Sequence, residues 1–377
     1  MTWPMKKIGD VCDVLPGFAF KSVDLGQEGI PVIKIGNITD SHSVDVASAQ
    51  CLPENLYMER HKKYLLKDGD ILIAMTGATA GKVGRIRCPA DQIMLLNQRV
   101  AKINPKGLNP DFFWSAISTD RYRTVFYGLG GGAAQPNMSG AQIESVEILC
   151  PPVDQQQRIA SILSAYDDLI ENNRRRIQLL EQAARLLYKE WFVYLRFPGH
   201  EHVKIKDGVP DGWEKNQIGE LAPFKYGKAL KEGDRIPGPY PVYGSSGIVG
   251  THDTALVAGT AIIVGRKGNV GSVYWSNIDF YPIDTVYYIE AENSSLYLYY
   301  ALLHTQFNST DVAVPGLNRN YAHSRTVLVP DDKIINLFEQ HSEVIHDQIE
   351  RLVKQRQVLT KARDLLLPRL MNGEVAI

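Results

Sequence analysis

The sequence contains few cysteines, and none of them is spaced for a metal site. The four cysteines, Cys12, Cys51, Cys88 and Cys150, lie in the first half of the chain and form no C-x-x-C pair. This spacing argues against a zinc site and against a disulfide framework. We therefore expect reduced thiols in a cytoplasmic protein.

Long apolar stretches are also missing. Residues 1–7 contain no apolar core of the kind that a signal peptide needs, and no stretch approaches the ~20 apolar residues that span a bilayer. An excess of positive charge is missing too, because the formal net charge is -1. Free-standing DNA-binding proteins are usually basic. The charge therefore argues mildly against DNA binding, unless basic residues cluster or a partner contacts the phosphates.

Two segments resemble enzyme motifs but lack residues that those motifs require. The segment 77–82 resembles a P-loop, but its glycines are one residue too close and Val83 replaces the hydroxyl residue that holds Mg²⁺. The segment 150–153 lacks the amide and aromatic side chains of an amino-methyltransferase motif. The nine histidines show no metal-ligand spacing. We therefore expect no catalytic residue, no metal and no cofactor in this chain.

The chain does contain an internal repeat. The matching parts are Trp3 with Trp213, 8–11 with 218–221, 69–83 with 259–273, and 138–187 with 317–366. The last two pairs each match at one constant offset. Such a register predicts a tandem duplication in which a globular domain and a long helix each occur twice.

The long helical segments carry the seam of a coiled coil. Apolar residues from Ile159 to Trp191 recur at alternating steps of four and three when Asn173 is included. Asn173 either sets the register as a buried polar residue or points to solvent. The second seam, from Phe338 to Leu370, is more polar and includes Ser342, Arg356 and Arg363. We expect the helices to pair antiparallel in a rod of roughly 60 Å, long enough to place two heads on DNA about one turn or somewhat more apart.

The fold class predicted is α+β, with two pseudo-repeated α/β domains separated by two long antiparallel coiled-coil helices. Strands are expected at 31–35, 70–74, 261–264 and 286–289, and short helices at 111–127 and 296–307. The expected divisions are a first recognition domain at 1–150, a first spacer helix at 151–196, a linker and second recognition domain at 197–330, and a second spacer helix at 331–377.

Three segments resemble the specificity subunits of Type I restriction-modification systems. Residues 151–160 and 187–192 resemble the start and the aromatic end of that family's first spacer helix. Phe197-Pro198-Gly199 followed by 210–213 resembles the start of its second target recognition domain, and 365–374 resembles its carboxy-terminal end. The resemblance extends over nearly the whole chain.

The resemblance implies a non-catalytic subunit that recognises a bipartite site in double-stranded DNA. Each target recognition domain would read one half-site, and the helices would fix the spacing. Two methyltransferase subunits would bind the pseudo-equivalent halves, and restriction subunits can join such a complex. S-adenosylmethionine, Mg²⁺ and ATP would then belong to the partner subunits alone.

Base reading needs donors and acceptors on rigid loops, whereas phosphate contact needs Lys, Arg or free backbone amides. The loops 76–85 and 266–271 meet this need, although a tight hairpin whose glycines serve only the turn would look the same. Loops 130–139 and 314–321 form a second pair, with a solvated loop as the alternative. The candidate DNA-binding residues are Thr76, Gly77, Thr79, Lys82, Arg85, Gln135, Asn137, Lys228, Ser245, Arg266, Lys267, Asn269, Asn318 and Arg319.

Some candidates invite a more specific interpretation. Arg266 can engage a guanine with two hydrogen bonds, and Asn269 can engage an adenine. Thr76-Gly77 stands where the second copy has Arg266-Lys267, so the corresponding loops carry different chemistry. The tyrosines of 225–228 and 243–246 either pack on DNA or belong to the core.

Two other functions stay open on the sequence. A protein-binding scaffold with two heads predicts exposed apolar patches on the heads, whereas the chain has Lys, Arg, Asn and Thr in glycine-rich loops. The recognition part of a fused DNA methyltransferase requires a cofactor motif that this sequence lacks.

Overall fold

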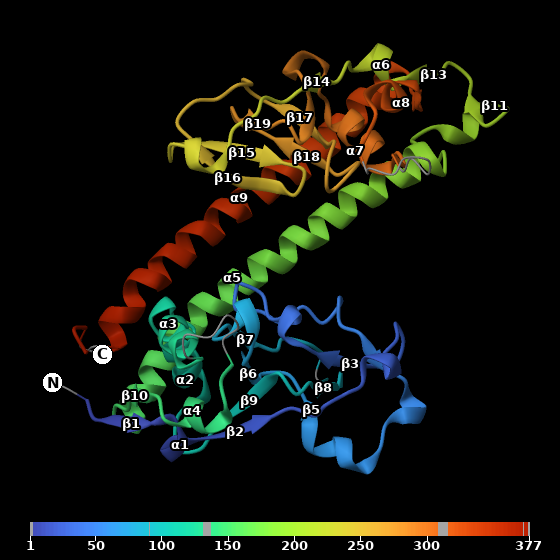
Figure 1. Cartoon of the computed structure of the whole chain (residues 1–377). Coiled ribbons are helices and arrows are strands. Elements are labelled where there is room, and N and C mark those ends of the chain that lie inside the picture. Colours follow the sequence, from blue (N-terminus) through green and yellow to red (C-terminus); the bar gives the residue numbers. More distant parts are fainter. Residues whose placement is uncertain (1–2, 90, 131–136, 308–315, 372, 376–377) are drawn as a thin grey trace. The chain divides into compact units, whose positions relative to one another are not determined.

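The computed structural model describes residues 3–89, 91–130, 137–307, 316–371 and 373–375. The chain forms two compact units (Figure 1). The first contains Met1–Asn172 and Arg356–Ile377, and the second contains Asn173–Gln355. The first unit therefore contains residues that precede and residues that follow the second unit in the sequence.

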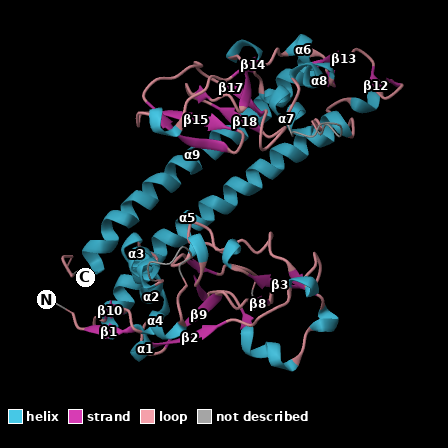
Figure 2. Ribbon diagram, viewed as in Figure 1, coloured by secondary structure: helices cyan, strands magenta, loops and turns pink. Residues whose placement is uncertain are grey.

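The first unit is built on two four-stranded sheets. Figure 2 draws its strands in magenta. One sheet has the order β2 (Cys12–Pro16), β9 (Val100–Pro105), β6 (Ile71–Ala74), β7 (Val83–Arg85), and the other has the order β4 (Cys51–Leu52), β3 (Ile30–Ile33), β8 (Met94–Leu96), β5 (Leu65–Leu66). A separate pair joins β1 (Met5–Lys7) to β10 (Glu147–Leu149). The short helices are α1 (Ile8–Val11), α2 (Pro110–Ile117), α3 (Asp120–Leu129) and α4 (Gly140–Glu144).

The second unit repeats this plan. Its larger sheet has the order β14 (Lys225–Tyr226), β20 (Val286–Ile289), β17 (Ala261–Gly265), β18 (Val273–Ser276), and the smaller has the order β16 (Gly247–His252), β15 (Tyr240–Gly244), β19 (Tyr281–Pro282). The pairs are β13 (Glu214–Gln217) with β21 (Thr326–Val329) and β11 (Ile205–Lys206) with β12 (Val209–Pro210). The short helices are α6 (Ile218–Leu221), α7 (Leu296–His304) and α8 (Arg319–Ser324).

The two units share their topology, which confirms the predicted duplication. The sheet β2-β9-β6-β7 corresponds to β14-β20-β17-β18, and the parallel pair β3–β8 corresponds to β15–β19. Even a close contact recurs. A Cβ added to Gly9 would lie 2.9 Å from Glu144, and one added to Gly219 would lie 2.7 Å from the equivalent residue, His323.

The local sequence explains why the main elements form. All four side chains of β6 are buried, as expected for a strand covered on both faces. Helix α2 begins after Asn109, whose side chain accepts hydrogen bonds from the amides of Asp111 and Phe112, and Pro110 occupies its first position. Ser295 caps α7 in the same way through the Leu298 amide.

Two long helices complete the units. Helix α5 (Val153–Tyr188) has 36 residues and α9 (Asp332–Met371) has 40. In the first unit, Ile159 and Leu163 of α5 share a core with Leu367 and Leu370 of α9. In the second unit, the end of α5 packs against the start of α9 around Phe338. The start of one helix meets the end of the other in each unit, which is the predicted antiparallel arrangement.

The predicted seam residues face the protein interior. Each one from Ile159 to Trp191 and from Phe338 to Leu370 is buried or half-buried. Asn173 is 7% exposed, so its side chain does not point to solvent. None of the helices in the described ranges combines the length and apolar character that crossing a membrane requires.

Candidate nucleic-acid interface

In each unit, the described end of the second candidate loop is joined to the first candidate loop through the main chain. In the first unit, Thr76 forms an isolated β-bridge with Asn137, and the amide of Met138 donates to the Met75 carbonyl at 2.9 Å. In the second unit, Lys267 bridges to Gly316, and the amide of Leu317 donates to the Arg266 carbonyl at 2.7 Å. Segments that are distant in the sequence thus meet at one place in each unit.

These hydrogen bonds correct the predicted alignment of the two loops. Since Leu317 corresponds to Met138, Arg266 is equivalent to Met75, and Lys267 is equivalent to Thr76. The second loop is one residue shorter, so the constant offset that placed Thr76 opposite Arg266 was wrong by one position. The error arose because glycines on both sides of the strand match at an offset that the strand itself does not keep.

In the first unit, the loop after β6 is shaped by its glycines. Gly77 has a φ of +74° and opens a short turn, in which the Thr79 hydroxyl donates to the Thr76 carbonyl at 3.3 Å. Gly81 has a φ of +81°, and a Cβ added there would lie 2.9 Å from the backbone nitrogen of Tyr127. Both glycines are therefore required by the turn and by helix α3, whatever else the loop binds.

The basic residues of this loop are held by acidic residues. Lys82 Nζ lies 2.8 Å from Asp40, which also accepts from Arg123 at 3.1 Å. Arg85 lies 2.6 Å from Asp111. The side chains of Lys82 and Arg85 are only 15% and 13% exposed. Because Lys82 donates a hydrogen bond to it, the Asp40 carboxyl has a pKa below its usual value.

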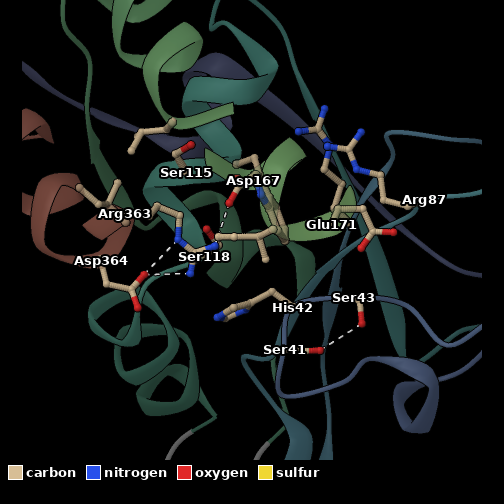
Figure 3. A pocket seen from close by; sticks show the side chains of 15 residues that line it. Ser41, His42, Ser43, Arg87, Ser115, Ser118, Asp167, Glu171, Arg363 and Asp364 are labelled. Carbon is tan, nitrogen blue, oxygen red and sulfur yellow. Dashed lines mark hydrogen bonds and ion pairs between the residues drawn. The ribbon is translucent and has the colours of Figure 1, made fainter. Parts of the chain in front are cut away.

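A cavity of about 140 Å³ lies between the first unit's loop 41–43, helix α2 and the parts of α5 and α9 that belong to this unit (Figure 3). His42 adopts a φ of +58°, and its ring meets that of Trp114 edge to face. Across the cavity, Arg363 Nη1 donates to Asp167 at 2.8 Å. The lining carries acidic and basic side chains together, so it gives no excess of positive charge for a phosphate.

In the second unit, two candidate arginines meet on one tyrosine ring. The guanidinium carbons of Arg266 and Arg319 lie 4.9 Å and 5.0 Å from the ring centre of Tyr226. Arg266 Nη1 also donates to the Asp284 carbonyl at 3.2 Å, and its guanidinium lies 5.8 Å from the Tyr287 ring centre. Tyr226 is 48% exposed, so the group opens to solvent.

Other candidates of the second unit divide into exposed and structural residues. Lys228 and Asn269 are exposed, and Lys267 lies 3.7 Å from Asp284. Ser245 is buried, and its carbonyl accepts hydrogen bonds from the hydroxyls of Ser272 and Tyr274. Asn318 caps α8, because its side chain accepts from the Tyr321 amide at 3.1 Å. In the first unit, Asn137 is exposed and Gln135 lies outside the described residues.

Sequence reasoning missed the residues that surround the candidates. Asp40, Asp111 and Arg123 were not recognised, because no local motif connects them to the loop that they contact. The sequence does not decide whether the tyrosines pack on DNA or in the core. The structure separates them, since Tyr226 is an exposed partner of two arginines whereas Tyr243 is buried in the core.

Comparisons with known proteins agree with this architecture. The family model described as "Type I restriction modification DNA specificity domain" matches residues 1–182 and 210–320. The MjaIX specificity subunit of Methanocaldococcus jannaschii is 24% identical over all of this chain and 94% of its own length. The HindI specificity subunit of Haemophilus influenzae is 22% identical over 83% of this chain and 88% of its own.

A solved structure shares the fold. The S subunit of a Type I restriction-modification system from M. genitalium has a TM-score of 0.60 and 18% identity, and the match covers 98% of this chain and 96% of that one. Two units of one topology, each with paired polar loops, are thus accompanied by a family match over more than half of the sequence. The chain belongs to the family of Type I restriction-modification DNA specificity subunits.

Proposed function

We propose that this chain selects the DNA sequence on which a Type I restriction-modification complex acts. Each unit reads one half of a split site through its paired loops. The observation that carries the proposal is that one backbone arrangement occurs twice and presents different side chains each time. The first unit presents Lys82 and Arg85, each in an ion pair with an aspartate. The second unit presents Arg266 and Arg319, which both lie over the Tyr226 ring. Two unlike half-sites fit such a pair of readers.

The chain acts in this proposal without chemistry of its own. S-adenosylmethionine, Mg²⁺ and ATP are used by partner subunits, and no cofactor is assigned to this chain. Two methyltransferase subunits bind it, one for each pseudo-equivalent half, and restriction subunits join the same assembly. The complex works in the cytoplasm, where the DNA is.

The long helices have a defined part in the proposal. They fix the number of base pairs between the half-sites, because α5 and α9 each contribute residues to both units. Removing or adding whole helical turns in both helices would change that number while leaving the half-sites themselves unchanged.

The experiment is genome-wide detection of methylated adenine in cells that express this chain with its methyltransferase partner. A single split motif is expected. Exchange of residues 1–150 for those of a relative should change one half of that motif and leave the other half unchanged. If the complex assembles but methylation is absent, or ignores the exchange, the units do not read sequence and a protein-binding scaffold becomes the better account.

A further inference from the structure

The Tyr226 group of the second unit carries two positive charges, those of Arg266 and Arg319. Within the described ranges, neither Arg266 nor Arg319 has an acidic side chain at ion-pair distance. The carboxylate of Asp284 lies 3.7 Å from Lys267, whereas Arg266 donates to the carbonyl of Asp284. Two like charges on one ring favour an electron-rich ligand.

The ring also fixes the orientation of the cations. A guanidinium that stacks on an aromatic face keeps its plane and presents its N–H donors edge-on. Arg266 is further restrained by Asp284 and Tyr287. Arg319 is exposed and lies over the Tyr226 ring, and among the described residues its guanidinium makes no hydrogen bond or ion pair, so its donors are free to bind a ligand.

The first unit shows that the fold does not require this group. Its β2–β9 pairing places Pro16 opposite Ala101, where the second unit pairs Tyr226 with Tyr287. Its hydrogen bonding places Met75 at the position of Arg266. Gly140 follows the cap Ser139 as Arg319 follows the cap Asn318, and a Cβ on Gly140 would lie 3.6 Å from Pro16.

At equivalent positions of one shared backbone, the second unit thus has Tyr, Tyr, Arg and Arg, and the first has Pro, Ala, Met and Gly. The apolar set preserves the same sheet, so packing does not account for the arginines. Side chains that the scaffold does not need, gathered on its polar loops, point to a ligand of the second unit alone.

We propose that this group is a guanine-reading site of the second half-site, in which Arg319 donates two hydrogen bonds to O6 and N7 of one guanine. Tyr226 and Arg266 are its positioning residues. Phosphate contact needs charge but no fixed plane, whereas a guanine edge needs a planar fork in one orientation. Because the Tyr226 ring restrains the Arg319 guanidinium, whose carbon lies 5.0 Å from the ring centre, the arrangement favours the base. This inference rests on the proposed function and names what one of its two readers recognises.

The test uses the complete complex of this chain with its methyltransferase subunit, after its methylated motif has been mapped. Each guanine of the second half-site is replaced in turn by 7-deazaguanine, which lacks the N7 acceptor. Binding is measured for the wild type, for Arg319→Lys and for Arg325→Lys. Arg325 is a matched control, because it lies just after α8, is exposed and rests on the Tyr321 ring at 5.8 Å.

Replacement of one particular guanine should weaken the wild-type and Arg325→Lys complexes roughly tenfold. The Arg319→Lys complex should ignore that replacement, and its methylated motif should become degenerate at that base pair alone. Lysine keeps the charge but loses the fork, so the change isolates guanine reading from phosphate attraction.

Three results would overturn the inference while leaving the proposed function intact. They are a second half-site without a G·C pair, unchanged sensitivity to every 7-deazaguanine in Arg319→Lys, and a loss of affinity in Arg319→Lys that is the same for every DNA sequence, which is the mark of a phosphate contact. If the wild-type complex methylates no defined sequence, the proposed function and the inference fail together.

Discussion

Arg363 on α9 donates a hydrogen bond from Nη1 to Asp167 on α5 at 2.8 Å, which joins the two helices within the first unit. Arg363 occupies a position of the helical seam that the sequence marks as polar. Its side chain is only about a quarter exposed, and its Nη2 contacts Asp364 at 2.8 Å. A charged residue is accepted in the seam here because both of its partners lie within reach.

We predict that Asp167→Ala destabilises the first unit by about 1–3 kcal/mol, because a half-buried guanidinium loses its hydrogen-bond partner. Urea denaturation measures the free energy of unfolding, and native-state hydrogen exchange of amides in the first unit assigns the loss to that unit. Asp364→Ala is the matched control. It removes a more exposed contact of the same arginine and should cost less than about 1 kcal/mol. Equal losses in the two variants would contradict the importance of the seam position.

The second prediction concerns Ser342, which takes the seam position of the second unit where the first unit has Leu163. Ser342 is 0% exposed, and its hydroxyl has no hydrogen-bond partner among the described residues. We predict that Ser342→Ala stabilises the second unit by about 1 kcal/mol, since the desolvated hydroxyl is removed.

The control for this prediction is Ser276→Ala in the same unit. Ser276 is also buried, but its hydroxyl donates to the Ile278 carbonyl at 2.8 Å. This variant should lose about 1 kcal/mol, because it leaves an acceptor unsatisfied. Changes in the free energy of unfolding that have opposite signs in the two variants support the argument. A loss of stability in both variants would refute it.

The third prediction concerns Asp40, which holds both Lys82 and Arg123 in the first unit. We predict that Asp40→Asn strengthens DNA binding by the assembled complex roughly 2- to 10-fold, because Lys82 becomes available to a phosphate. The dependence of log K on log salt should steepen by about 1. Titration of labelled DNA at several salt concentrations measures both quantities.

Asp13→Asn controls for the change in net charge. Asp13 forms an exposed ion pair with Lys106, toward the end of β2 opposite Pro16. It should leave the affinity and the salt dependence close to those of the wild type. If Asp13→Asn tightens binding as much as Asp40→Asn does, the effect is one of total charge and the pairing with Lys82 is irrelevant.

The helical seam and the duplication could be predicted because both depend on the regular spacing of residues along the sequence. The steps from Ile159 to Trp191 fix which side chains are buried without knowledge of the partner. The one-residue difference between Met75 and Arg266 could not be seen in this way, because flanking glycines matched at the wrong register. Only the hydrogen bond that each carbonyl accepts revealed the true equivalence.

The chemistry of the candidate site was harder to predict than its location. Lys82 and Arg319 were identified by residue type, but what they contact depends on strands and loops that come from distant parts of the sequence. Asp40 neutralises the one, and Tyr226 supports the other. Residue type alone therefore predicted the same role for Lys82 and Arg319, although the fold places one in an ion pair and the other over an aromatic ring.

The last prediction concerns His346, which lies on α9 beneath the aromatic residues of the second unit. Its Nε2 is 2.8 Å from the Tyr300 hydroxyl, and its ring packs near those of Trp275 and Tyr299. Burial lowers the pKa of His346 from its ordinary 6.5 to about 4. The unfolded chain therefore binds a proton between these pH values that the folded unit excludes.

It follows that the stability due to this histidine is complete above pH 6.5 and is lost as the pH falls toward 4, by up to about 3 kcal/mol. We predict that His346→Gln, which can still bond Tyr300 but cannot be protonated, flattens the acid limb of the second unit's unfolding free energy. His202→Gln, at an exposed position, should keep the wild-type slope. Denaturant melts at pH 7, 6, 5 and 4 make the comparison. If the two variants lose stability in parallel with the wild type, His346 is already protonated in the folded unit and burial does not govern its titration.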